Sequence, residues 1–144
     1  MPQEETVVRQ TVPYGLATAV AVPPAEAIAR ARAALAEEGF GVLCEIDVAA
    51  TLAQKLGLSF RPYVILGACN PTFAHQALEV EPDLGLLLPC NVIVYAGEER
   101  DTSVVAALDP EAALAVTGNP RLEPIAREVK QRLTRVLERV AAGT

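Results

Sequence analysis

The sequence has a single histidine, three cysteines and none of the short motifs that mark common nucleotide- and metal-dependent enzymes. GxGxxG, the P-loop, GxSxG and HExxH are all missing. The chain therefore lacks the usual signatures of dinucleotide binding, phosphate binding, serine hydrolysis and zinc proteolysis. The odd number of cysteines fits reduced thiols better than a disulfide framework. Any chemistry must therefore depend on residues outside these motifs.

Long apolar runs and a clear targeting signal are also missing. No apolar run approaches the roughly 18 residues needed to cross a bilayer. The first residues show no signal-peptide pattern, and residues 2–6 are acidic. We therefore expect a cytoplasmic protein without membrane contact. The formal net charge of −6 argues against a nucleic-acid partner, because lysines and arginines that meet phosphates supply that affinity.

The pattern of apolar residues predicts one α+β domain spanning residues 1–144. A chain of this length suits a single domain, and its 51% hydrophobic content is enough for a sizeable core. No repeat, low-complexity stretch or long linker marks a boundary. Mostly antiparallel strands, backed by helices on one face, fit the order of the elements. Strands are expected at 6–12, 16–22, 41–48, 63–69, 90–96 and 102–108, and helices at 24–38, 48–56, 71–80, 110–118 and from 120 onward.

Four segments in order carry a family resemblance: GFGVLCEIDV, KLGLSFRPYVILGACNP, GLLLPCNVIVY and the closing Asp109-Pro110. Together they make roughly residues 24–118 resemble the bacterial and archaeal "domain of unknown function 302" family. The resemblance implies a TBP-like α+β fold with a homodimeric assembly, and it implies no established activity. Many relatives carry a histidine directly after the aspartate of the "ID" motif, where this chain has Val48, so chemistry that needs an Asp-His pair there is in doubt.

The pair Cys-Asn occurs twice, at 69–70 and at 90–91, in two different settings. Asn70 precedes a proline at the start of an expected helix and is therefore explained as its N-cap. Cys69 stands beside that helix start, where the helix dipole favours a thiolate. The alternative is that Cys69 is a small buried hydrophobe, as free cysteine often is.

Cys69 and Cys90 are the candidate residues for a binding site. They stand at the end of one strand and the beginning of another, and the sheet could bring them together. Two thiols suit a soft metal ion or a reversible disulfide, although their spacing matches no known zinc pattern. Our leading hypothesis is that the sheet end near Cys69, Asn70 and Cys90 binds a small ligand or a soft metal ion.

Two other thiol or imidazole side chains are predicted to lie elsewhere. Cys44 alternates with Val42 and Ile46, which places it in the core as a packing residue. His75 falls on the polar side of its helix, where it can pair with Glu79 four residues on. Neither residue is therefore expected to complete a metal site.

Glu45 and Asp47 form a second candidate site because they project from the same side of one strand. Two such carboxylates can divide acid and base roles, and Tyr63 could join them. The alternative is that Asp47 caps the following helix while Glu45 faces solvent or a partner subunit. An enzyme that uses these carboxylates is therefore one alternative function. A homodimeric interaction module without chemistry of its own is another.

Overall fold

The structure is a computed structural model, and it describes residues 7–143. Its centre is a six-stranded sheet with the order β1-β2-β6-β5-β4-β3, and every neighbouring pair is antiparallel. This confirms the predicted α+β class. The strands are β1 (Arg9–Val12), β2 (Gly15–Val20), β3 (Gly41–Asp47), β4 (Tyr63–Cys69), β5 (Cys90–Ala96) and β6 (Ser103–Leu108).

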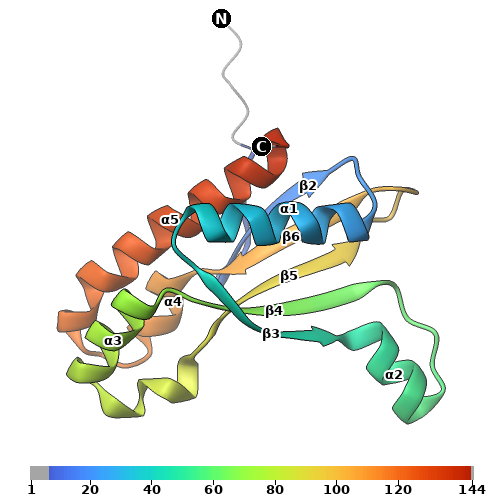
Figure 1. Cartoon of the computed structure of the whole chain (residues 1–144). Helices are drawn as coiled ribbons and strands as arrows, with labels where there is room; N and C mark the ends of the chain where they lie inside the picture. Colours follow the sequence, from blue (N-terminus) through green and yellow to red (C-terminus); the bar gives the residue numbers. More distant parts are fainter. Residues whose placement is uncertain (1–6, 144) are drawn as a thin grey trace, which may run out of the picture.

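The helices stand on one face of the sheet and at its ends. Figure 1 shows α1 and α5 on the same side of the sheet, where they pack against each other. Over residues 7–143, no helix is long and apolar enough to span a bilayer. The helices are α1 (Pro24–Glu37), α2 (Val48–Leu56), α3 (Pro71–Val80), α4 (Pro110–Ala115) and α5 (Glu123–Ala142), with the 3-10 helices η1 (Pro82–Leu87) and η2 (Pro120–Leu122).

Most element boundaries follow the predicted ranges to within two residues, whereas α4 ends at Ala115 rather than near residue 118, and residues 82–87, which carried no predicted helix, form η1. The last helix begins with the short turn of η2 rather than with α-helix. The first strand was expected over 6–12, and β1 starts at Arg9, whereas Thr6 lies outside the described residues. Alternation alone sets strand ends poorly, because pairing with a neighbour decides where a strand begins.

Asparagine or aspartate side chains cap the starts of α2, α3 and α4, which confirms the predicted Asn70 cap and the alternative given for Asp47. Asn70 Oδ1 accepts a hydrogen bond from the Phe73 amide at 3.3 Å, and Asp47 Oδ1 accepts one from the Ala50 amide at 2.8 Å. These bonds satisfy N–H groups that have no partner within the helix. At the other end of α1, Gly39 has a φ of 84°, which a glycine adopts without strain. The caps thus fix the residues at which these helices begin and end.

The core lies between the inner face of the sheet and the two long helices. Leu66, Val92 and Val94 point toward α1 and α5 and are completely buried. Three alanines of α1 are also fully buried, and their small side chains let this helix approach the sheet closely. A second, smaller cluster forms around Ala77, Leu84 and Leu122 where α3, η1 and η2 meet.

A β-bulge in β3 reverses the predicted orientation of Cys44. Val42 pairs with Ala68 and Cys44 pairs with Gly67, so Leu43 is an extra residue in this strand. Val42 packs against the core, whereas Cys44 is exposed on the opposite face. The prediction that Cys44 is a core residue is therefore wrong, because one inserted residue turns every later side chain to the other face.

A carboxylate at the end of α1 ties that helix to α5. Glu38 is only 7% exposed, and its Oε1 accepts a hydrogen bond from Arg135 Nε at 2.6 Å. Arg139 lies 3.4 Å from the other carboxylate oxygen. Arg132 donates to the Glu38 backbone carbonyl at 3.1 Å. Three arginines of α5 therefore hold the C-terminus of α1 in place.

Glu38→Gln should lower the free energy of unfolding by about 1–3 kcal/mol, because it removes the charge of a buried carboxylate that pairs with two partly exposed arginines. Chemical denaturation measures this change. Glu128→Gln is the matched control, since Glu128 pairs with Arg132 at a more exposed site, where the loss should be within about 0.5 kcal/mol. Equal losses in the two variants would contradict the proposed role of Glu38.

Candidate functional site

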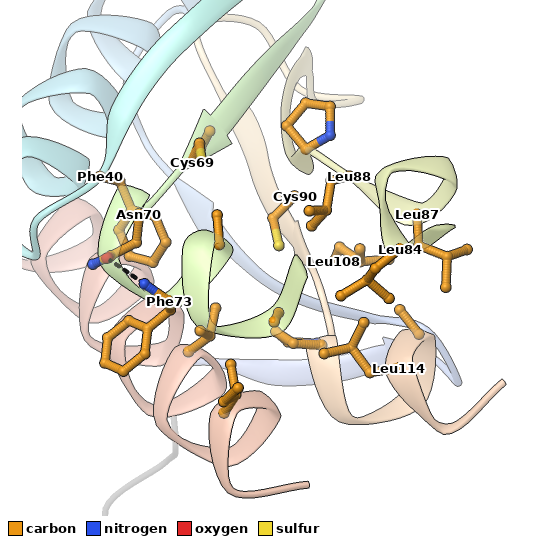
Figure 2. Close-up of a pocket in the computed structure, with 18 residues that line it drawn as sticks. Phe40, Cys69, Asn70, Phe73, Leu84, Leu87, Leu88, Cys90, Leu108 and Leu114 are labelled. Atoms are coloured by element: carbon orange, nitrogen blue, oxygen red, sulfur yellow. Dashed lines mark hydrogen bonds between the residues drawn. The ribbon is translucent and has the colours of Figure 1, made fainter. Parts of the chain in front are cut away.

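A small cavity lies at the end of the sheet where β4 stops and β5 begins. Its volume is about 40 Å³, and Cys69, Asn70 and Cys90 all contribute to its lining. Figure 2 shows the Cys90 sulfur pointing into the space between the surrounding apolar side chains. The cavity therefore lies where the sequence predicts the leading candidate site.

The cavity exists because two hydrophobic clusters meet without filling the space between them. Ile125 packs against both the main core and the smaller cluster, and it also lines the cavity. Four lining residues are alanines, whose single methyl groups leave room that a larger side chain would occupy: Ala68, Ala74, Ala77 and Ala113. The cavity thus lies between two hydrophobic clusters, and different helices and strands enclose it on several sides.

Cys69 and Cys90 come from neighbouring strands, but the pairing does not place them opposite each other. Cys90 is directly opposite Ala68, so Cys69 lies one position farther along β4. Because successive residues point to opposite faces of a strand, the two side chains leave the sheet on different sides. Both thiols are free. The structure thus brings the two residues to one cavity without joining them.

Burial makes both thiols poor sources of thiolate. It raises the pKa of Cys90 to about 11, with a smaller contribution from the nearby Cys69 thiol. Burial also raises the pKa of Cys69. The raised pKa of Cys69 favours the alternative of a partly buried, neutral thiol over a thiolate.

The described residues 7–143 contain no cluster of three or more histidine, cysteine, aspartate or glutamate side chains that could hold a metal ion. His75 lies 3.4 Å from Glu79 on the surface, and the two side chains are 76% and 72% exposed. This confirms the predicted surface pair. The soft-metal candidates Cys69 and Cys90 therefore have no third protein ligand from this part of the chain.

The second candidate site is divided between the two faces of the sheet. Asp47 caps α2, and Glu45 accepts from Arg32 of α1 at 2.8 Å. Tyr63 projects from the other face, where its ring stacks on Tyr95 with a centroid distance of 5.3 Å. Burial and the neighbouring phenols of Tyr95 and Tyr14 raise the pKa of Tyr63. The two carboxylates thus have structural partners, and Tyr63 does not join them.

Sequence reasoning missed most of the apolar residues that surround Cys90. Leu84, Leu87 and Leu88 line the cavity, yet they belong to a segment that reads as a proline-bounded loop. The available signal was the run of leucines between Pro82 and Pro89, since a solvent-exposed loop rarely carries so many apolar side chains. Only the fold shows which of these leucines turn inward.

Alkylation with N-ethylmaleimide at pH 7 should modify Cys44 first and Cys90 last, because Cys44 is exposed whereas a pKa near 11 leaves only about one ten-thousandth of Cys90 as thiolate. The rate at Cys90 should rise about tenfold per pH unit up to about pH 11. Peptide mapping by mass spectrometry follows each site. Rapid labelling of Cys90 at pH 7 would contradict the buried position of its thiol.

Comparisons with known proteins agree with the resemblance carried by the motifs. The model of a family described as "Domain of unknown function DUF302" matches residues 16–140. The crystal structure of an uncharacterized conserved DUF302 protein from Bacillus stearothermophilus is similar, with 34% sequence identity and a TM-score of 0.81. That match covers 88% of this chain and 98% of the other. No protein with a curated description matches. The matched range also includes most of β2 and most of α5, which lie beyond the motifs.

Proposed function

The chain belongs to the DUF302 family, and we propose that it binds a small molecule in the cavity at the end of its sheet. The observation that carries this proposal is the cavity itself, which is lined by residues of seven helices and strands and of the connections between them, and contains the Cys90 thiol (Figure 2). Small-molecule sites are concave, mostly apolar and often formed where several elements meet. The position of this cavity between two hydrophobic clusters fits that description.

A small molecule suits this cavity better than a soft metal ion. A metal binds cysteine as thiolate, and the raised pKa of Cys90 opposes that form at neutral pH. The apolar surroundings that disfavour the thiolate favour uncharged groups instead. The geometry therefore supports the small-molecule form of the binding hypothesis.

Xenon is a suitable first probe, because dry apolar cavities take it up. Under xenon pressure, the amide NMR signals of residues that line the cavity should shift. Ala113→Leu should remove these shifts, since Ala113 lines the cavity and the longer side chain fills it. Ala115→Leu is the matched control, because Ala115 lies on the same helix but is exposed. Equal xenon responses in both variants, or no response in the unmodified chain, would contradict the proposal.

A second candidate function is homodimerisation through the face of the sheet that α1 and α5 leave open. The middle row of side chains on this face is apolar across β3, β4 and β5, where Ile46 pairs with Ile65 and Ile65 with Ile93. Ile46 is 47% exposed. A row of large apolar side chains open to water is typical of interaction surfaces.

The same face changes from large to small side chains across the sheet. Ile93 pairs with Ala106 of β6, and Ala106 pairs with Ala17 of β2. In a two-fold dimer the same patch contacts itself, so the isoleucine half of one copy can pack on the alanine half of the other. Five strands spaced about 4.8 Å apart and three rows about 7 Å apart give roughly 500 Å² of flat area on each copy.

The segment from β3 to the loop before β4 extends this surface. α2 has no buried residue, and several large apolar side chains of the segment are exposed, among them Leu43, Leu56, Leu58 and Phe60. Figure 1 shows α2 projecting from the end of the sheet. Its addition brings the area toward the roughly 800 Å² per partner of a stable interface.

Ile46→Arg should convert the dimer to a monomer, because it places a charge in the apolar row, at its end on the edge strand β3. Analytical ultracentrifugation at micromolar protein concentrations measures the oligomeric state. Val116→Arg is the matched control, since Val116 is 78% exposed at the end of α4, outside the strands that form the apolar row, and should leave the dimer intact. A monomeric unmodified chain would refute this candidate function.

A further inference from the structure

The cavity constrains the chemistry of the molecule that fills it, and this inference rests on the proposed binding function. We propose that the ligand is a molecule with an unbranched alkyl end, and that this end enters the cavity with its last two or three carbon atoms. Its polar part then stays outside. Three features of the cavity support this ligand class: the composition of its lining, its size and the position of its polar atoms.

The lining consists almost entirely of hydrocarbon side chains. No charged residue contributes to it, and the polar contributors are Asn70 and the thiols of Cys69 and Cys90. An ionised or strongly polar group placed here would lose its hydration without gaining a partner. The raised pKa of Cys90 has the same cause, because burial at this position disfavours a charged group. The part of the ligand inside the cavity is therefore apolar.

Asn70 does not offer a hydrogen bond to the cavity. Its side-chain oxygen is already used by the Phe73 amide. Figure 2 shows its amide group directed away from Cys90. The thiol of Cys90 is a weak donor and a polarisable surface that suits contact with methylene groups. Nothing at the centre of the cavity would hold a ligand hydroxyl or carbonyl.

The size of the cavity favours a chain end over a ring. A volume of about 40 Å³ is roughly three times the ~10–15 Å³ that one water-sized sphere occupies. A dry cavity that takes benzene is nearer ~150 Å³. Two or three carbon atoms in a row fit the smaller space. Because the cavity is only partly enclosed, the remainder of the molecule can continue outward.

The test is a titration with the straight-chain alcohols from methanol to 1-hexanol, followed by the NMR signals of the residues that line the cavity. The dissociation constant should fall about fourfold for each methylene that enters, which is the ratio expected for about 0.8 kcal/mol per buried CH₂. It should then change little once the cavity is full. An unchanged constant along the whole series would overturn the proposed ligand class.

A matched pair of probes tests which end is buried. 1,6-Hexanediol has the chain of 1-hexanol with a hydroxyl at both ends, so it must bury a hydroxyl without a partner and should bind at least tenfold more weakly. Equal affinities would refute an apolar buried end. Ala113→Leu should abolish the binding of 1-hexanol, whereas Ala115→Leu should retain it.

The two proposals fail in different ways. If xenon shifts the lining residues but the alcohols show no gain with chain length, the ligand class is wrong and the binding function stands. If neither xenon nor the alcohols respond to Ala113→Leu, both proposals are wrong. If 1-hexanol binds equally to the Ala113→Leu variant, its site lies elsewhere and the ligand class is overturned.

Discussion

The antiparallel pairing of β4 with β5 is the constraint on which the rest of the structure depends. Its register places Leu66 opposite Val92 on the helix side and Ile65 opposite Ile93 on the open side. A shift of one residue would turn every one of these side chains to the other face. The same register sets Cys90 beside Ala68 at the end of the sheet. The core, the open face and the cavity are therefore all consequences of one strand pairing.

The cavity costs stability, and the fold compensates for that cost elsewhere. At about 24 cal/mol per Å³, an empty space of about 40 Å³ costs roughly 1 kcal/mol. A single larger residue in place of Ala74 or Ala113 could fill it. The fully buried apolar layer between α1 and the sheet is large enough to offset such a cost, and the Glu38 carboxylate adds ion pairs with two partly exposed arginines of α5.

The two faces of the sheet have different roles. The inner face is built from valine, leucine and alanine that α1 and α5 cover, and it stabilises the monomer. The outer face carries Ile46, Ile65, Ile93 and the stacked pair of Tyr63 and Tyr95. Strand 63–69 is apolar on both sides in sequence, which predicts cover on both sides. In the structure its inner residues are buried, whereas Tyr63, Ile65 and Cys69 are only half-buried. A second copy on this face would supply the missing cover.

The sequence by itself determined the elements and their caps. Asn70 and Asp47 were identifiable as caps because a short polar side chain before a helix satisfies local N–H groups, and no distant residue takes part. The surface pair of His75 with Glu79 was equally local. Tertiary structure alone decided the direction of Cys44, because its bulge arises from the pairing of β3 with β4. It also decided the cavity around Cys90, since residues from Phe40 to Val129 must first be brought together before an empty space exists between them. A void forms where side chains that are far apart in the sequence pack against one another, so no local sequence pattern encodes it.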